Sequence, residues 1–242
     1  GLCETHITAD VAYAADRYRE ITGDGTLDGA LSQLYLETAR YWLSRFTWEP
    51  DRNRYSSFFV KGPDEYCGAA VNNTFTNYLA RHNVRLALNH AAMDEAERER
   101  LQHFCEHVTL LYDPQRHLYL QDELFDRLEP MPDGHAQGEP LYKSVCFDRM
   151  QRYRALKQAD LVQLMTMFPD DFSDGEKRAV WDRYEPLTVH DSSLSFGIHA
   201  LLAFRLGLEK VGWRYFERSL CFDLSDELGN TGREGIHMAA LG

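Results

Sequence analysis

The spacing of apolar residues along the chain predicts a protein built mainly from helices. Apolar side chains recur every three or four positions in a series of segments, which is the pattern of a helix that buries one face. The first such segment begins at about residue 7 and stops at the glycine-containing run 22–25, where a helix end is expected. The other expected helices are residues 28–46, 77–91, 94–111, 157–168, 173–184, 192–207 and 209–222.

The side chains within these segments indicate which helix faces are apolar. On the first helix, Ile7, Val11, Ala14 and Tyr18 share one face. On the second, the expected buried stripe consists of Leu31, Leu34, Tyr35, Thr38 and Trp42. Residues 173–176 are Ser-Asp-Gly-Glu, a capping box that begins the 173–184 helix. The last two helices are separated only by residues 207 and 208 and should form a helical hairpin.

The connections between helices contain a few strand signals. Residues 54–60 are rich in aromatic residues, and residues 48–60 together predict a hairpin-like entry to the turn that follows. Residues 113–140 are the least regular part of the chain, with a short strand expected at 117–121. Loops of this length are uncommon in compact domains and often shape a binding site.

Composition and charge narrow the class of protein. Of the 242 residues, 44% are hydrophobic, so the chain can form a substantial core. The net charge of −12 argues against nucleic acid or an anionic membrane as a partner. No apolar run approaches the length of a bilayer span, and residues 1–20 lack the pattern of a signal peptide. The five cysteines are scattered without a Cys-x-x-Cys pair, so a reduced, cytoplasmic protein is expected.

Two histidines have a spacing that metal ligands also show. His103 and His107 lie four residues apart on one expected helix. No acidic residue or cysteine accompanies them in the pattern of a known metal motif, so we expect no metal site there.

The candidate chemistry begins at residues 62–66, which are Gly-Pro-Asp-Glu-Tyr. Pro63 has no N–H and keeps the preceding glycine out of the helical region, so Asp64 and Glu65 are expected on a turn between a strand and a helix. A turn held by two regular elements can carry a catalytic carboxylate. The alternative from composition alone is a solvated turn without a chemical role.

This run and five others resemble a known family. Gly-Pro-Asp-Glu-Tyr, followed by Asn-Asn-Thr-Phe-Thr-Asn at 72–77, is similar to the signature of glycoside hydrolase family 65. Residues 156–160, 188–195 and 230–240 match later motifs in the same order, and residues 5–10 match near the start. The family contains inverting phosphorylases of α-linked glucosides such as maltose, trehalose, kojibiose and nigerose, together with some hydrolases.

The resemblance implies a fold. The catalytic domain of the family is an (α/α)6 barrel, a toroid of six helical hairpins, so we expect an all-α fold with short β-hairpins in its loops. Residues 1–242 would be the C-terminal portion of that barrel, with the β-sandwich domain and the first barrel helices of the family absent. Fewer helices are expected here than a closed barrel needs.

The resemblance also implies a reaction, the inverting phosphorolysis of an α-glucoside to β-glucose 1-phosphate. Phosphate is itself the nucleophile in such an enzyme, so one carboxylate suffices as general acid. Glu65 matches that acid, phosphate is a co-substrate, and no cofactor is implied. The implied binding residues are His190, Ser192, Ser193 and His237 for phosphate, and Lys157 and Gln158 for the glucose unit. The parent protein is expected to be a homodimer.

The residues around the phosphate motif partly support this role without the resemblance. Ser192 and Ser193 begin an expected helix, where hydroxyl and backbone N–H groups can bind an anion. The ordinary alternative is that Ser192 is a plain N-cap and His190 a surface residue. Lys157, at the expected start of a helix, would most simply be solvated.

Three features depart from the family pattern. The Trp-Asp pair that holds glucose in the family lies upstream of the Gly-Pro-Asp-Glu-Tyr turn, and it is expected to be absent because the chain begins too late to include it. Trp181 and Asp182 lie downstream of the turn and are expected to be packing and surface residues. Cys67 and Val71 stand where the phosphorylases commonly have His and Asp. Because of these changes, the resemblance does not indicate which acceptor sugar the enzyme uses.

Two other functions remain as alternatives. An inverting hydrolase would need a base carboxylate, for which Asp191 and Glu185 are the candidates. A sugar-binding helical module without catalysis is the other. We also expect the 242-residue chain alone to be inactive and marginally stable, with the apolar strip of residues 7–18 exposed.

Overall fold

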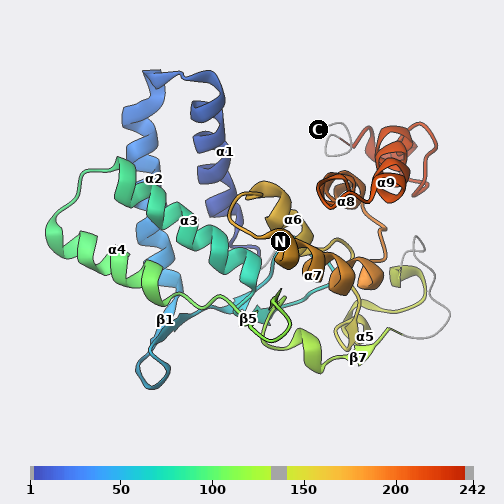
Figure 1. Cartoon of the computed structure of the whole chain (residues 1–242), viewed down its shortest axis with the longest axis horizontal. Coiled ribbons are helices and arrows are strands. Elements are labelled where there is room, and N and C mark those ends of the chain that lie inside the picture. Colours follow the sequence, from blue (N-terminus) through green and yellow to red (C-terminus); the bar gives the residue numbers. More distant parts are fainter. Residues whose placement is uncertain (1–2, 132–140, 238–242) are drawn as a thin grey trace. The chain divides into compact units, whose positions relative to one another are not determined.

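The structure is a computed structural model that describes residues 3–131 and 141–237. Helices make up most of it and strands of two or three residues occupy the connections, which confirms the all-α prediction. The chain forms two compact units (Figure 1). The first comprises the residues up to Gly62, Ala69–Leu111 and Gln121–Glu123. The second comprises Pro63–Gly68, Tyr112–Leu120 and the residues from Leu124 onward.

The first unit is a group of helices joined by two small antiparallel strand pairs, β1–β2 and β3–β4. Its helices are α1 (Ile7–Thr22), α2 (Asp28–Arg45), α3 (Thr74–His90) and α4 (Glu95–His107). Its strands are β1 (Thr47–Glu49), β2 (Arg54–Ser56), β3 (Phe58–Val60) and β4 (Ala70–Val71). The expected 54–60 strand is divided because Ser57 lies between β2 and β3 and the β3–β4 register shifts at a bulge.

The helix α3 lies at the centre of the first unit. It packs against α1, α2 and α4, and it buries Leu79, Val84 and Leu86. Trp42 of α2 is fully buried, and its indole N–H donates to Asn83 of α3 at 2.9 Å. In Figure 1, α1 and α2 lie side by side as a hairpin.

The helix α1 turns small residues toward its neighbours. Ala9 and Ala12 are buried, whereas Ile7, Val11 and Tyr18 are 50%, 52% and 47% exposed. The apolar strip of this helix is therefore exposed, as the sequence predicted.

The Asn-Asn-Thr-Phe-Thr-Asn run begins α3 and holds it in place. The side chain of Asn73 accepts the N–H of Thr76 at 3.0 Å, so the helix begins at Thr74. The prediction that it begins at residue 77 is wrong, because the motif itself forms the first turn.

The last residue of this motif lies in a buried polar network. The Asn77 amide donates to Asn72 Oδ1 at 3.2 Å and to the Thr109 carbonyl at 2.8 Å, and it accepts from the Ser57 hydroxyl at 2.6 Å. Asn72 has φ of 53°, a left-handed conformation that asparagine adopts more readily than most residues. Each polar group of the Asn77 side chain is paired, so the network fixes the connection before α3 to the segment after α4.

Replacing Asn77 by alanine should destabilise the first unit. The change leaves buried partners without hydrogen bonds, and we expect a loss of about 2–3 kcal/mol in the free energy of unfolding. Urea denaturation would measure it, with Asn89→Ala on the exposed face of the same helix as the matched control. Equal unfolding midpoints for the two variants would show that the network contributes no stability.

The second unit contains the remaining helices and two further strand pairs, β5–β6 antiparallel and β7–β8 parallel. Its strands are β5 (Tyr112–Asp113), β6 (Leu118–Tyr119), β7 (Glu129–Pro130) and β8 (Tyr153–Arg154). Its helices are α5 (Phe147–Met150), α6 (Asp160–Met167), α7 (Asp174–Tyr184), α8 (Ser193–Arg205), α9 (Glu209–Cys221) and α10 (Thr231–Glu234). The capping box predicted at residues 173–176 is present on α7.

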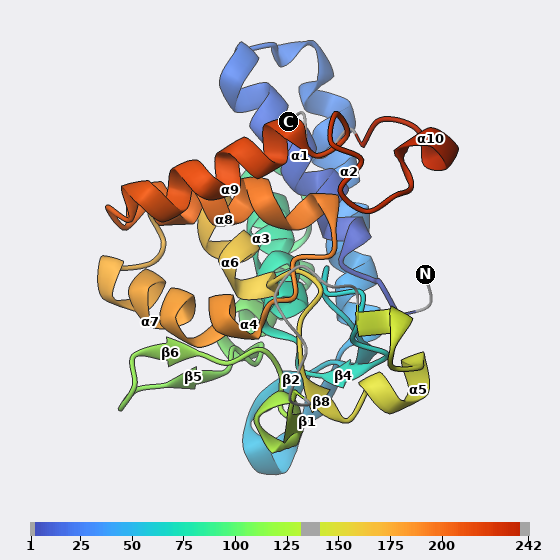
Figure 2. The ribbon, with the colours of Figure 1, turned by 90° about the vertical axis from the view of Figure 1, so that its right-hand side faces the viewer.

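The helices α8 and α9 form the predicted hairpin (Figure 2). Gly207 has φ of 71° and reverses the chain between them. A Cβ atom on Gly212 would lie 2.8 Å from the ring of Phe204, so glycine at this position allows close packing. On the other side, α8 packs against α6, which in turn packs against α7.

The segment before α6 differs from the prediction. Lys157 and Gln158 were expected to open a helix, but α6 begins only at Asp160. The Leu156 backbone instead pairs with the segment at Thr188, and the Lys157 N–H donates to the Asp64 carboxyl group. These tertiary hydrogen bonds take the place of helical ones, so Lys157 and Gln158 form a bend in the loop before α6.

Candidate active site

The turn at Pro63–Gly68 presents Glu65 to solvent. Asp64 Oδ1 accepts the N–H of Tyr66 at 3.1 Å, which closes the turn around Glu65. Asp64 and Tyr66 on either side are buried, whereas the Glu65 side chain is 47% exposed. The Glu65 carboxylate thus projects to solvent between two buried residues, Asp64 and Tyr66, and all three belong to the second unit.

Two side chains from the loop before α6 contact that carboxylate. Lys157 Nζ lies 2.7 Å from Glu65 Oε2, and Gln158 Nε2 donates to the same oxygen at 3.2 Å. Gln158 Nε2 also donates to the Pro63 carbonyl at 2.7 Å. The structure therefore brings together Glu65, Lys157 and Gln158, three residues that the sequence assigned to one site.

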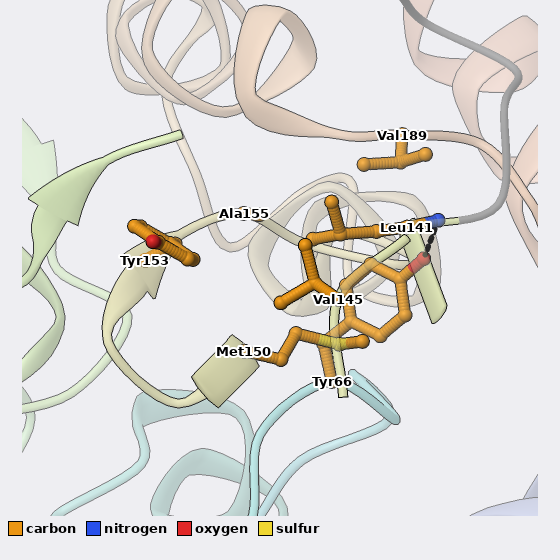
Figure 3. Close-up of a cluster of buried hydrophobic side chains, with 7 residues drawn as sticks. All are labelled: Tyr66, Leu141, Val145, Met150, Tyr153, Ala155 and Val189. Atoms are coloured by element: carbon orange, nitrogen blue, oxygen red, sulfur yellow. Dashed lines mark hydrogen bonds between the residues drawn. The ribbon is translucent and has the colours of Figure 1, made fainter. Parts of the chain in front are cut away.

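Tyr66 connects the turn to two other segments. Its hydroxyl donates to Asp191 Oδ2 and accepts the N–H of Leu141 at 2.9 Å. Its ring packs in a buried apolar cluster that includes Val145 and Met150 (Figure 3). The residue after Glu65 thus fixes the turn through both its ring and its hydroxyl.

Gln151, just after α5, also holds this turn through two hydrogen bonds to its backbone. Its Nε2 donates to the Tyr66 carbonyl at 2.6 Å, and its Oε1 accepts the N–H of Gly68 at 2.6 Å. A Cβ atom on Gly68 would lie 2.9 Å from Gln151 Oε1, so glycine is required for this approach. No pattern in the sequence indicated Gln151, because its role depends on a contact across more than eighty residues.

The loop before α8 is held by a buried histidine. His190 has φ of 61° and is 1% exposed. Its Nδ1 lies 2.8 Å from the Ser195 hydroxyl, and its Nε2 lies 3.0 Å from the Tyr215 hydroxyl, which donates to Glu185 at 2.6 Å. Both ring nitrogens of His190 therefore have partners within the protein.

A second histidine lies against the first. The rings of His190 and His199 are 4.5 Å apart, and His199 Nδ1 lies 2.7 Å from the Ser195 carbonyl. Burial lowers the pKa of His190 to about 2 and that of His199 to about 4. Both imidazoles are consequently neutral at pH 7.

The two serines expected at the phosphate site lie at the start of α8. Ser192 is the N-cap, and its hydroxyl accepts the N–H of Leu194 at 3.2 Å. Ser193 is the first residue of the helix and half-buried. The residue before them, Asp191, is 1% exposed, and burial raises the pKa of its carboxyl group. Hydroxyl and N–H groups therefore gather at a helix N-terminus next to the partner of Tyr66.

His237 lies in the segment after α9. Its Nδ1 is 2.6 Å from Asp223 Oδ1, and its backbone N–H donates to the other oxygen of the same carboxylate at 2.8 Å. The ring also packs edge-on against Phe222. Asp223 and Phe222 thus hold His237 in the segment that follows α9.

The other histidine pair is packed with aromatic rings in the first unit. His103 and His107 stack with ring centroids 4.2 Å apart, and Trp48 lies 4.7 Å from His103. Within residues 3–131 and 141–237, no group of three or more His, Cys, Asp or Glu side chains could hold a metal ion.

Trp181 and Asp182, which were expected to be a packing residue and a surface residue, are placed as predicted. Trp181 is buried, and Asp182 forms an exposed ion pair with Arg178 at 3.1 Å. Glu37 and Arg40 form the kind of surface pair common three residues apart on a helix, at 2.6 Å.

Comparison with protein families identifies the class. The whole chain, residues 1–242, matches the model of the glycosyl hydrolase family 65 central catalytic domain. The chain therefore belongs to glycoside hydrolase family 65.

Individual members of the family are similar to the chain in sequence and in structure. The chain is 31% identical over 263 residues to the kojibiose phosphorylase of Halothermothrix orenii, which covers 100% of the chain and 34% of that protein. It is 29% identical to the maltose phosphorylase of Bacillus subtilis, over 98% of the chain and 33% of that protein. A solved structure of a candidate kojibiose phosphorylase from the human microbiome matches 97% of the chain and 37% of its own, with a TM-score of 0.86 and 28% identity. The chain spans about a third of the length of these relatives.

No helix within the described residues is both long and apolar enough to span a bilayer.

Proposed function

We propose that the protein containing this chain catalyses the inverting phosphorolysis of an α-glucosyl disaccharide or glucoside. Glu65 donates a proton to the glycosidic oxygen while a phosphate oxygen attacks the anomeric carbon from the opposite face. The bond from that carbon to the glycosidic oxygen breaks, giving β-glucose 1-phosphate and a free sugar. The observation that carries this proposal is the exposed Glu65 carboxylate, held by Lys157 Nζ at 2.7 Å and Gln158 Nε2 at 3.2 Å.

Lys157 and Gln158 are proposed to bind hydroxyl groups of the glucose unit. Both are long donors, and both already lie against the proposed acid. The acid must hold its proton when the bond breaks, so we propose that the substrate draws the Lys157 ammonium group away from Glu65.

Phosphate is proposed to bind at the N-terminus of α8. Ser192 and Ser193 supply hydroxyl and N–H groups at the positive end of the helix dipole, and His237, whose Nδ1 lies 2.6 Å from Asp223 Oδ1, is proposed as a further phosphate ligand. His190 supports this site through its position, because both of its ring nitrogens have partners in the protein. No cofactor takes part in the proposal.

The carboxylates that a hydrolase would need as a base already accept hydrogen bonds from tyrosine hydroxyls. Asp191 accepts the Tyr66 hydroxyl and is 1% exposed, and Glu185 accepts the Tyr215 hydroxyl. These tyrosine contacts favour phosphate over water as the nucleophile. The same proposal places residues 1–242 in an (α/α)6 barrel, as its C-terminal portion, and the parent protein as a cytoplasmic homodimer.

The proposal predicts that cleavage depends on phosphate. Without phosphate, the full-length protein should release almost no glucose from kojibiose or maltose, and with phosphate it should form β-glucose 1-phosphate. Ser193→Ala should raise the KM for phosphate by about 10-fold or more, since a hydrogen bond to a charged group contributes about 1.5–3 kcal/mol. Ser173→Ala, at the N-terminus of α7, is the matched control.

Two results would contradict it. Equal rates of glucose release with and without phosphate would establish a hydrolase. A Ser193→Ala variant that weakens sugar binding and leaves the KM for phosphate unchanged would remove α8 from the phosphate site.

A further inference from the structure

Asp64 links the two chain segments that carry the proposed acid and its lysine. Its Oδ1 accepts the N–H of Tyr66 at 3.1 Å within the turn and the N–H of Lys157 at 2.8 Å from the loop before α6. One buried oxygen, on a side chain that is 2% exposed, thus joins two segments 93 residues apart. Glu65 follows Asp64 directly, so the position of this oxygen sets where Glu65 meets Lys157.

A second contact runs between the same segments in the opposite direction. The backbone N–H of Asp64 donates to Asp160 Oδ1, at the first residue of α6, at 2.7 Å. Each segment therefore gives a backbone N–H to a carboxyl group of the other. Such paired contacts restrict the separation between the segments more tightly than one hydrogen bond.

We propose that Asp64 is a positioning residue, which holds the proposed general acid Glu65 in register with Lys157 by accepting both N–H groups. This inference rests on the function proposed above. The side chain of Asp64 does not face solvent, and it acts through its backbone partners. The carboxyl oxygen is needed as an acceptor, and a negative charge at this position is not.

The surroundings of Asp64 favour an uncharged carboxyl group. Burial raises its pKa well above the ordinary value, and the neighbouring carboxyl groups of Asp160 and Asp191 raise it further. The two N–H donors act in the opposite direction but are outweighed. Asparagine has the same shape as the uncharged group and keeps the accepting oxygen, so it should replace Asp64 without a large loss of activity.

Three variants of the full-length protein test this role. Asp64→Asn keeps the acceptor and should retain kcat within about 3-fold. Asp64→Ser can close the turn to Tyr66 but is too short to reach Lys157 as well. It should lose about 100-fold in kcat, because a misplacement of about 1 Å at a reacting group has an effect of that size. Asp64→Ala should lose at least as much, and the KM for phosphate should change little in all three.

An activated substrate separates positioning of the acid from general damage. The fluoride of α-glucosyl fluoride leaves with little help from an acid, so Asp64→Ser and Asp64→Ala should act on it, with phosphate, at nearly the wild-type rate. Asp174→Ala, at an exposed aspartate of α7, serves as the control. If wild-type protein gives no β-glucose 1-phosphate from either substrate, the proposed function has failed and Asp64 is not at issue.

The remaining outcomes decide the role of Asp64. Wild-type kcat for Asp64→Ser on a disaccharide would overturn it. A loss in Asp64→Asn equal to that in Asp64→Ser would also overturn it, since the charge would then matter instead of the acceptor. An equal loss on the disaccharide and on the fluoride would show that Asp64 does not act through the acid.

Discussion

Glu65→Gln is expected to lower kcat for disaccharide phosphorolysis by about two to four orders of magnitude, because the variant has no proton to donate to the leaving oxygen. The amide keeps the shape of the carboxyl group and can still contact Gln158, so the KM for the disaccharide should change much less. Coupled detection of β-glucose 1-phosphate in the full-length protein would measure both constants.

A matched control for this variant lies in the same unit. Glu217→Gln removes an exposed carboxylate from α9 and should leave kcat unchanged. On α-glucosyl fluoride, Glu65→Gln should recover most of its activity. Near-normal turnover of an unactivated disaccharide by Glu65→Gln would remove Glu65 from the role of acid.

The second large effect concerns stability below pH 7. His190 and His199 are neutral in the folded protein, with pKa values of about 2 and 4, whereas an unfolded histidine has a pKa near 6.5. Below about pH 6.5 the unfolded chain binds more protons than the folded one, so stability falls with pH. From pH 7 to pH 5 the two residues together should lower the free energy of unfolding by about 3–4 kcal/mol.

Urea denaturation followed by tryptophan fluorescence can measure this dependence, because Trp181 lies 5.9 Å from His199. His199→Phe retains an aromatic ring and removes one titrating group. Between pH 5 and 6 it should reduce the pH slope of the free energy by about 1.2 kcal/mol per unit. An unchanged slope would show that His199 is not held neutral in the folded protein.

The helices could be predicted from the sequence because their signals are local. The capping box of Ser173 and Glu176, the apolar spacing of α3 and the short link between α8 and α9 each lie within a few residues. The errors arose where tertiary hydrogen bonds override local preference. Lys157 lies outside the helix because its N–H donates to Asp64, a contact that the residues around Lys157 in the sequence do not indicate.

The candidate site was predictable to a similar degree. The motif resemblance grouped Glu65, Lys157 and Gln158, and the structure brings these side chains into contact. The roles of Asp64 and Gln151 were not predicted, because both act on backbone groups and carry no chemical signature in the sequence. For His190 the resemblance implied a place at the phosphate site, and its burial and its two intramolecular partners are the reason for proposing that it acts there by supporting the loop.

The contacts that hold the Glu65 turn have a consequence for synthesis of the protein. The turn is translated before the residues that anchor it, Lys157, Asp160 and Asp191, which follow Asp64 or Tyr66 by 93, 96 and 125 residues. Contacts of such high sequence separation form late in folding, after much loop entropy has been lost. On the ribosome, the proposed acid would leave the exit tunnel well before the residues that orient it, since domains emerge from the N-terminus onward. In a nascent chain, α1 to α4 should therefore fold before α6 to α9, and the Glu65 turn should reach its final geometry only when α8 has emerged.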